Sequence, residues 1–366
     1  MNVTGVTRYI SGLIKALPGV GSHEYTLLLN RRVPPSLLPE APNVRWRTTA
    51  FPIVGTKTRI LWEQFVQPFE VAFHGFDVIH HTDRSMPWLP LGVPSVSTIQ
   101  DISYVSFPET YTRGKVVYNE LTARIAAARA DRIIVVSENT KREVIRYLKV
   151  PEEKVRVVYS AVEDMFSPIL DVETLQKVKQ RFGLPDKIIL YVGSLNPRKN
   201  LITLIRVYAE LRRTSDLLHR LVLAGPSDWK SDPVYQTIRD LGLESEIVLP
   251  GLVQGFDLVC LYNLADLFVF PSLHEGFGFP PLEALACGTP VVCSNAASLP
   301  EVVGDAAILV EPTDVGGLAR AMERVLTDAE LARQLRGKGL ERAKFFSWDK
   351  TARETIKVYE EVAKRQ

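Results

Sequence analysis

Short apolar runs alternate along the chain with longer segments in which apolar positions recur every three or four residues. The short runs are rich in Val and Ile, which is typical of parallel strands buried on both faces. Such alternation predicts an α/β fold built from βα units. In the first half, the pattern predicts helices at 118–130 and 139–148 and strands at 25–30, 77–82, 94–101, 131–137 and 154–160.

The second half of the chain repeats this pattern. Strands are predicted at 188–195, 220–225, 246–251, 266–272, 290–295 and 306–312. Helices are predicted at 201–214, 281–287, 315–326, 329–345 and 349–364. The stretch 161–184 contains a proline, a charged helix and a glycine, and is interpreted as a domain connection. Because 366 residues exceed one ordinary hydrophobic core, we expect two domains.

Composition and charge exclude several classes of protein. The chain has 44 basic and 42 acidic residues. Its net charge is therefore too small to attract nucleic acid electrostatically, and no nucleic-acid partner is expected. The three cysteines lack metal-site spacing and indicate a reducing, cytoplasmic environment. The first 17 residues do not resemble a secretory signal, and no run reaches the roughly 20 apolar residues of a membrane span.

The segment 274–292 carries the densest candidate chemistry, HEGFGFPPLEALACGTPVV, directly after a predicted strand. Gly276 and Gly278 lie in the turn before the next helix, where backbone amides and the helix dipole favour an anion. Glu275 and Glu283 flank this turn, and each carboxylate can accept two hydrogen bonds from a diol. The pattern suits a diphosphate with a sugar at one end and a ribose at the other. A plain connecting loop with two solvated glutamates is the alternative.

A second cluster, YVGSLNPRKNL at 191–201, begins on a predicted strand and ends at a helix. Asn196 and Pro197 predict a turn, with Arg198 and Lys199 at its exit. Cations at the carboxyl end of a parallel strand are placed to neutralise a diphosphate. A solvated basic pair is the alternative, although cations oppose the dipole at a helix start and so favour a bound anion.

The segments 193–200 and 275–284 resemble the retaining glycosyltransferases of family 4, also called glycosyl transferases group 1. The likeness covers nearly the whole chain and is strongest in its second half. It implies the GT-B fold, in which two Rossmann-like domains face a central cleft and the C-terminal helix crosses back to the N-terminal domain. The implied domains are an acceptor domain at 1–165, completed by 349–366, and a nucleotide-sugar-binding domain at 166–348.

This resemblance also implies an activity. The chain is expected to transfer a hexose, with mannose favoured, from a nucleotide-sugar such as GDP-mannose to a glycan or lipid-linked acceptor in cell-surface polysaccharide assembly. Retention at the anomeric carbon is implied, with no metal and no cofactor. A nucleotide-sugar epimerase of the same fold and a non-catalytic nucleotide-sugar-binding protein remain alternatives. Basic side chains in 110–129 leave peripheral contact with the inner face of a membrane open, beside an ordinary solvated helix.

The resemblance assigns roles to individual residues. Glu275 is expected to hold hydroxyl groups of the transferred sugar and Glu283 those of the ribose. Arg198 and Lys199 are expected to pair with the diphosphate, with more weight on Arg198 because some relatives carry an arginine where this chain has Ser194. The donor contacts implied in addition are Gly5, Val6, Gly193, Ser194, Gly225, Val253, Gly276, Phe277, Gly278 and Phe279.

The first half departs from the family at two places. Its glycine loop is matched from Gly5, but only four residues precede it, so we expect the natural protein to start upstream with a further strand. Gln100 stands where many relatives carry a histidine that contacts the transferred sugar, and it cannot titrate near neutrality. Gln100 and the following Asp101 are nevertheless expected in the catalytic group.

Three further polar residues end predicted strands of the first half. His80 and His81 are expected either to be buried and hydrogen-bonded or to contact a sugar. Ser137 is expected to cap a helix, with acceptor contact as the alternative.

Overall fold

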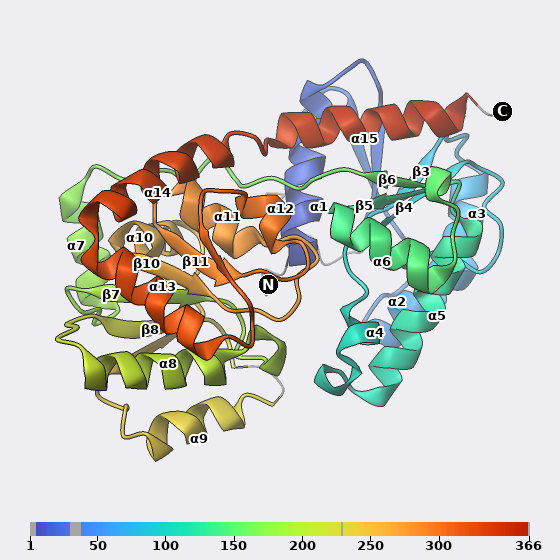
Figure 1. Ribbon diagram of the computed structural model, residues 1–366. Coiled ribbons are helices and arrows are strands. Elements are labelled where there is room, and N and C mark those ends of the chain that lie inside the picture. Colours follow the sequence, from blue (N-terminus) through green and yellow to red (C-terminus); the bar gives the residue numbers. More distant parts are fainter. Residues whose placement is uncertain (1–4, 30–37, 228–229, 365–366) are drawn as a thin grey trace. The chain divides into compact units, whose positions relative to one another are not determined.

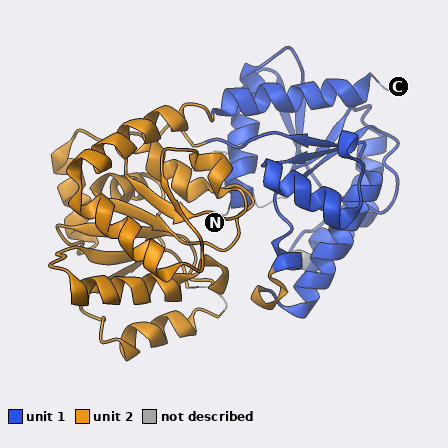
Figure 2. Ribbon diagram, viewed as in Figure 1, with its two compact units in different colours: residues 1–106, 111–161, 347–366 blue, residues 107–110, 162–346 orange. Residues whose placement is uncertain are grey.

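The computed structural model describes residues 5–29, 38–227 and 230–364 (Figure 1). The chain divides into two compact units (Figure 2). The N-terminal unit comprises residues 1–106, 111–161 and 347–366, and the C-terminal unit comprises residues 107–110 and 162–346. The last stretch of the chain therefore belongs to the first unit.

The C-terminal unit is built on a six-stranded parallel sheet with the strand order β12-β11-β10-β7-β8-β9. Its strands are β7 (Ile188–Val192), β8 (Arg220–Ala224), β9 (Ile247–Gly251), β10 (Leu267–Phe270), β11 (Val291–Ser294) and β12 (Ile308–Val310). Every residue of β7, β10 and β11 is buried, as their continuous apolar runs predict. All six strands predicted in this half are confirmed.

Helices cover this sheet, and they are α7 (Val172–Arg181), α8 (Leu201–Thr214), α9 (Asp232–Asp240), α10 (Phe256–Leu264), α11 (Phe279–Ala286), α12 (Leu299–Val303), α13 (Val315–Thr327) and α14 (Ala329–Ala343). The predicted bounds of α8 are confirmed. The sequence pattern missed α10, because five consecutive residues from Leu258 to Tyr262 are buried and leave no apolar stripe at helical spacing.

The N-terminal unit contains a four-stranded parallel sheet with the order β3-β4-β5-β6 and a separate parallel pair, β1-β2. The strands are β1 (Tyr25–Leu29), β2 (Val44–Thr48), β3 (Ile79–His81), β4 (Ser95–Ile99), β5 (Arg132–Val135) and β6 (Val155–Val157). The sequence pattern missed β2, because four of its five residues are exposed. The other helices of this unit include α4 (Ser103–Ser106), α5 (Arg113–Arg129) and α6 (Glu138–Leu148).

The C-terminal helix α15 (Trp348–Ala363) packs on the N-terminal unit, which confirms this feature of the expected fold. Val358 and Val362 join a buried cluster with residues of β4 and β5. Glu361 accepts hydrogen bonds from Arg132 at 2.5 Å and from Arg156 at 2.7 Å. Apolar contact and paired charge together hold this helix against the sheet.

The first described helix, α1 (Gly5–Ala16), differs from expectation. A glycine loop was expected from Gly5, but Gly5 and Val6 lie in the first turn of α1. The buried residues of α1, Tyr9, Gly12 and Leu13, recur at helical spacing, whereas Val6 at its start is exposed. Residues 1–4, where a preceding strand was considered, lie outside the described residues.

The segment 56–72 was also missed by the sequence pattern. It forms α2 (Thr56–Leu61), a π-helical turn at Trp62–Val66 and α3 (Gln67–Ala72). Its buried side chains include polar ones, and its exposed side chains include large apolar ones, so the usual amphipathic signal is absent.

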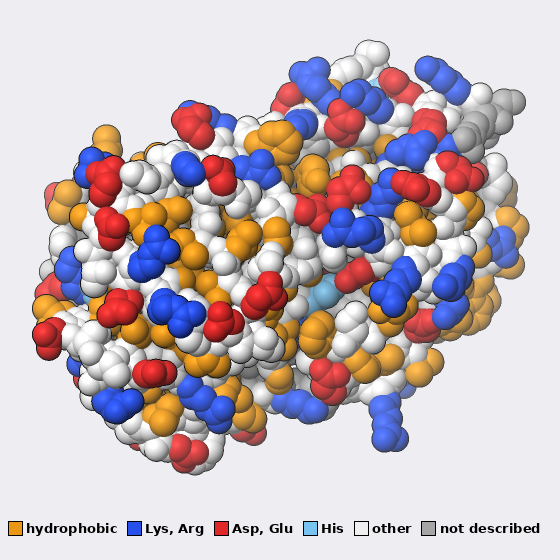
Figure 3. All heavy atoms as spheres, viewed as in Figure 1, with side chains coloured by type: hydrophobic (Ala, Val, Ile, Leu, Met, Phe, Trp, Pro, Cys, Tyr) orange, Lys and Arg blue, Asp and Glu red, His pale blue; other side chains and the backbone are white. Residues whose placement is uncertain are grey.

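The charged surface agrees with the small net charge of the chain. On the face shown in Figure 3, acidic and basic side chains are interspersed rather than gathered into one field. Among the described residues, no helix combines the length and apolarity that crossing a bilayer requires.

Candidate functional site

Two loops of the C-terminal unit carry most of the predicted site residues. One follows β7 and the other follows β10, and these strands are neighbours in the parallel sheet. The amide of Leu273 donates to the carbonyl of Arg198 at 2.9 Å, and the Ser272 hydroxyl donates to the same carbonyl at 3.3 Å. The loops are therefore tied together at the carboxyl edge of the sheet, where ligands bind in such folds.

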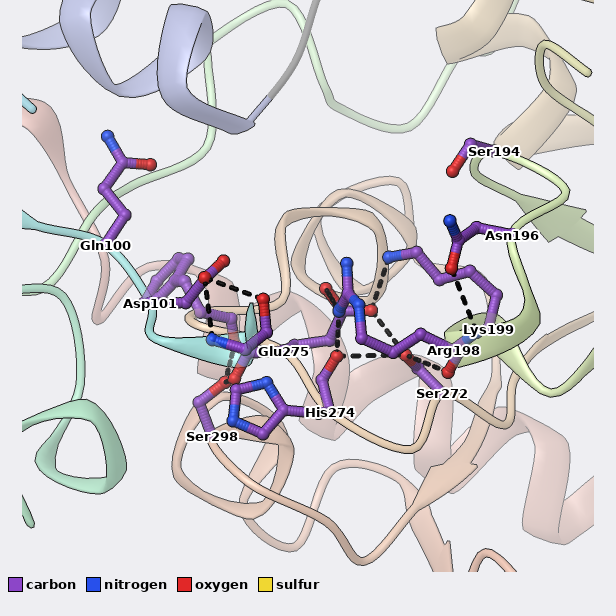
Figure 4. A network of polar contacts seen from close by, with 12 residues as sticks. Gln100, Asp101, Ser194, Asn196, Arg198, Lys199, Ser272, His274, Glu275 and Ser298 are labelled. Carbon is purple, nitrogen blue, oxygen red and sulfur yellow. Dashed lines mark hydrogen bonds and ion pairs between the residues drawn. The ribbon is translucent and has the colours of Figure 1, made fainter. Parts of the chain in front are cut away.

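The predicted turn at Asn196 and Pro197 is confirmed. Residues Pro197–Lys199 form one 3-10 turn, and the Asn196 side chain accepts a hydrogen bond from the Arg198 amide at 3.0 Å. Asn200 then takes a left-handed conformation with φ 57° and begins α8. This geometry brings the side chains of Arg198 and Lys199 to the second loop (Figure 4).

Glu275 lies between these two cations. Its carboxylate is 2.5 Å from the Lys199 ammonium and 3.5 Å from the Arg198 guanidinium, and it accepts a hydrogen bond from Ser272. Burial would raise the pKa of Glu275, but attraction to Lys199 and then Arg198 outweighs this and lowers the pKa. The Lys199 and Glu275 side chains are only 11% and 12% exposed, so the alternatives of solvated charges are wrong for both.

Two glycines shape the neighbouring edge of the sheet. Gly193 after β7 and Gly225 after β8 have φ angles of 153° and 156°, which side chains rarely adopt. A Cβ atom on Gly225 would lie 1.9 Å from the Gly193 carbonyl oxygen. The two loops approach each other so closely that only a residue without a side chain fits at Gly225.

The second loop ends where Gly278, with φ 117°, begins α11. Pro280 and Pro281 follow, and neither has an amide hydrogen. The backbone amides with a hydrogen at this helix start therefore belong to residues 277–279. Ser298, at the start of α12, donates to the carbonyls of Glu275 and Phe277 at 2.9 and 2.6 Å, which turns both carbonyls toward its own hydroxyl.

Glu283 lies inside α11 and is only 2% exposed. The Tyr262 hydroxyl of α10 donates to the Glu283 carboxylate at 2.8 Å, and the Thr289 hydroxyl donates to the Tyr262 carbonyl at 2.6 Å. The alternative of a solvated Glu283 is therefore wrong. Sequence analysis missed Tyr262 and Ser272; the signal for Tyr262 is a single phenol in an apolar run, which needs a partner when buried.

Two expected donor contacts lie near this edge but outside the polar network. Ser194 follows β7, and its carbonyl accepts a hydrogen bond from the Tyr191 hydroxyl at 3.0 Å. Val253 follows β9 and is buried. Their contact with a donor stays a prediction, as does that of Gly276, which lies between Glu275 and Phe277.

In the N-terminal unit, Gln100 and Asp101 follow β4. One Asp101 carboxylate oxygen accepts hydrogen bonds from the amide and hydroxyl of Ser103, the first residue of α4, at 3.1 and 2.8 Å. Gln100 is half-buried, and its side-chain nitrogen is buried without a hydrogen-bond partner among the described residues. Their catalytic role stays a prediction.

His80 and Ser137 have structural partners in the same unit. His80 contacts the hydroxyls of Tyr359 at 2.6 Å and Thr98 at 2.8 Å, and burial lowers the pKa of His80 to about 3. The Ser137 hydroxyl accepts a hydrogen bond from the Thr140 amide at 3.0 Å and caps α6. Burial of His80 and capping by Ser137 are thus confirmed.

No metal cluster accompanies these groups in the described parts of the chain, where no three His, Cys, Asp or Glu side chains gather as ligands would. The positive charge of the network comes from Arg198 and Lys199.

Comparison with known proteins places this geometry in a family. Residues 172–342 match the family described as Glycosyl transferases group 1, and residues 3–165 match Glycosyltransferase Family 4. O-antigen chain mannosyltransferase B of Escherichia coli is 35% identical over 293 residues, which are 79% of this chain and 74% of that protein.

A second relative and a solved structure extend the comparison. The serotype-specific mannosyltransferase WbdA of Escherichia coli is 39% identical over 231 residues, which are 61% of this chain but only 28% of that longer protein. Anabaena HepE, solved with UDP and glucose, shares the fold with a TM-score of 0.75 at 18% identity, over 98% of this chain and 96% of that one. The chain therefore belongs to the family 4, group 1 glycosyl transferases, and is a glycosyltransferase of the GT-B fold.

Proposed function

We propose that this glycosyltransferase moves a mannosyl group from GDP-mannose to a hydroxyl group of a growing glycan, with retention at the anomeric carbon. Two relatives at 35% and 39% identity are mannosyltransferases, and one of them acts on an O-antigen chain. Anabaena HepE, which shares the fold, holds UDP and glucose, which supports a nucleotide-sugar as the donor class. The acceptor is proposed to be a polysaccharide chain or its lipid-linked precursor.

One observation carries this proposal: the buried group of Arg198, Lys199 and Glu275. Two cations against one carboxylate leave an excess of one positive charge beside the amides at the start of α11. A diphosphate is the complementary ligand, because charge-assisted hydrogen bonds from Arg and Lys to phosphate are strong when partly buried. The ionised Glu275 can then accept hydrogen bonds from hydroxyl groups of the sugar next to that diphosphate.

The remaining proposed contacts follow from the surrounding elements. The Glu283 carboxylate accepts hydrogen bonds from the ribose hydroxyl groups. The hydrogen bond from the Tyr262 hydroxyl fixes the orientation of that carboxylate. Gly193 and Gly225 are proposed to place backbone beside the donor, in loops that pack on each other so closely that Gly225 has no room for a side chain. Ser298 fixes the loop that carries Glu275 and Phe277.

The proposed reaction is a displacement on one face of the sugar. The bond between the anomeric carbon and the diphosphate oxygen breaks, and a bond to the acceptor oxygen forms on the same face. The acceptor hydroxyl gives its proton to the departing phosphate oxygen, so no protein base is consumed. Arg198, Lys199 and the loop amides stabilise the negative charge that grows on the leaving group.

The experiment that tests this proposal supplies GDP-mannose, UDP-glucose and ADP-glucose in turn, with octyl α-D-mannopyranoside or an O-antigen glycan as acceptor. Mass spectrometry is expected to show a product heavier by one hexose only with GDP-mannose, and GDP release only when an acceptor is present. Transfer is expected to persist in EDTA. An isomerised nucleotide-sugar formed without acceptor would instead indicate an epimerase, and binding without turnover would indicate a non-catalytic protein.

A further inference from the structure

One face of the helical segment 56–73 in the N-terminal unit carries exposed apolar side chains. The segment comprises α2, the π turn and α3, and the Phe73 amide extends it by donating to the Phe69 carbonyl at 3.2 Å. The exposed side chains recur every four residues and form what we call the apolar row: Leu61 (49% exposed), Phe65 (56%), Phe69 (59%) and Phe73 (84%). A surface helix normally buries its apolar residues, so this row indicates a surface that a partner covers.

Hydrogen bonds on the opposite side of the segment hold this orientation. The side-chain amide of Gln64, which is buried, donates to the Met86 carbonyl at 3.2 Å. The Glu70 carboxylate accepts hydrogen bonds from the Trp62 indole at 3.0 Å and from the Thr49 hydroxyl at 2.7 Å. Rolling the segment inward to bury the apolar row would break these bonds and leave buried polar groups without partners, which is costly. The row therefore stays on the surface of a single chain.

The π turn keeps the apolar row close to the direction of the helix axis. In a regular α-helix, side chains four residues apart drift by about 40° around the axis at each step, because one turn takes 3.6 residues. The π turn at Trp62–Val66 holds more residues per turn and offsets part of this drift. The row therefore runs nearly straight along the segment, a geometry in which a second helix can lie against its whole length.

The apolar row is symmetric in the sequence about position 67. Phe65 and Phe69 lie two positions on either side of it, and Leu61 and Phe73 lie six positions on either side. A two-fold interface uses the same surface of both copies, and in an antiparallel pair each residue faces its mirror position. Phe65 of one copy then meets Phe69 of the other, and Leu61 meets Phe73. Every member of the row thus packs against an apolar side chain.

The charges at the two ends of the segment are complementary in the same arrangement. Lys57 lies ten positions before position 67 and Asp77 lies ten positions after it, and both side chains are exposed. Antiparallel pairing brings the Lys57 end of each copy to the Asp77 end of the other, which gives two attractive pairs per dimer. A parallel arrangement would bring like charges together. An anionic lipid surface is also less suited, because it would repel Asp77.

The size of the apolar row also fits a pair of copies. Because an aromatic side chain buries about 150–250 Å², the exposed parts of the four side chains amount to roughly 500 Å² per copy. Two copies would then cover roughly 1,000 Å², the lower limit for a specific protein interface. We propose that the apolar row is the interface of a two-fold dimer, in which a second copy of this chain packs antiparallel along the segment 57–77. This pairing is independent of which sugar the protein transfers.

Sedimentation-velocity ultracentrifugation of the full chain tests the pairing. Because the interface is small, the wild-type protein is expected to pass from one copy to two with a Kd of roughly 1–100 µM. Phe65→Glu and Phe69→Glu are each expected to raise this Kd at least about 30-fold, because a carboxylate from each copy would be buried in the interface. Leu218→Glu is the matched control, since Leu218 is an exposed apolar residue of the C-terminal unit, and it should keep the wild-type Kd.

Exchanging the end charges tests the antiparallel arrangement. Lys57→Glu and Asp77→Lys are each expected to raise the Kd about tenfold, because each variant places like charges opposite each other twice in the dimer. The double variant carries both substitutions and restores opposite charges, so its Kd should return to within about threefold of the wild-type value. A double variant that pairs more weakly than both single variants would overturn the arrangement.

Other outcomes would overturn the dimer itself. One is a wild-type protein that stays a single copy up to about 100 µM, and another is a Phe65→Glu variant, shown to be folded by its urea transition, that pairs as the wild-type protein does. Vesicles of phosphatidylethanolamine and phosphatidylglycerol test the lipid alternative. If the wild-type protein sedimented with these vesicles, Phe69→Glu did not, and neither paired in solution, a lipid surface would be the occupant and the proposal would be wrong.

Discussion

Removing the charge of Lys199 tests whether its pair with Glu275 serves structure alone or also the reaction. The variant Lys199→Met keeps the length and apolar stem of the side chain but removes its ammonium group. The partner variant Glu275→Gln keeps the shape of the carboxylate and removes its charge. The double variant removes both charges and completes a thermodynamic cycle.

The structure sets the magnitude of the effect on stability. Both side chains are about nine-tenths buried, with 11% and 12% exposed, so solvent screens the pair weakly. Losing one partner of a buried ion pair costs about 3–5 kcal/mol of unfolding free energy. Arg198 at 3.5 Å and the Ser272 hydroxyl still face Glu275, so about 3 kcal/mol is expected for Lys199→Met, the lower end of that range.

Stability and catalysis should respond differently in the cycle. Urea unfolding of the double variant is expected to show a loss at least 1 kcal/mol or so smaller than the sum of the two single losses, because no carboxylate is left underpaired. Mannosyl transfer is expected to fall about 100-fold in Lys199→Met, and the double variant should not recover it, because both groups are proposed to contact the donor.

Two outcomes would contradict this reasoning. If Lys199→Met unfolded at the same urea concentration as the wild-type protein, the buried ion pair would not contribute to the free energy of unfolding. If the double variant regained wild-type transfer, the pair would be a structural brace that does not contact the donor. The Arg198→Lys variant serves as a control, because it keeps the positive charge but loses the guanidinium geometry.

Further predictions concern other parts of the molecule. Tyr262→Phe should raise the donor KM about tenfold, because Glu283 loses a hydrogen bond to its charged group, and initial-rate kinetics at saturating acceptor would show it. Gly225→Ala should abolish folding or cost more than about 3 kcal/mol in urea unfolding, since its Cβ would overlap the Gly193 carbonyl; a wild-type transition would contradict this. Because the pKa of His80 falls from 6.5 to about 3 on folding, the unfolded chain binds the extra proton in that range, so stability should fall as pH drops from 6.5 toward 3, by up to about 1.4 kcal/mol per unit, and less steeply in His80→Gln.

Much of the candidate site could be anticipated from short stretches of sequence. Asn196 and Pro197 predict their turn because a side-chain cap and a fixed φ angle act within three residues. The glycines and prolines at 276–281 mark the start of α11 for similarly local reasons. These local signals do not identify the partner of each side chain. Glu275 pairs with Lys199, which is 76 positions away in the sequence. The partner of Glu283 is Tyr262, which lies on a helix that the hydrophobic pattern did not predict.

The sequence by itself determined most of the buried parallel strands, the α/β class and the two glycine-rich loops after β7 and β10, because hydrophobic period and turn chemistry act over a few residues. The tertiary structure decided which charges lie buried and against what. It turned Glu275 from a candidate sugar contact into the centre of an ion-pair network, and it turned Glu63 and Gln67 inward. Burial depends on neighbours that are remote in the chain, and the free energy of a charge depends on that burial.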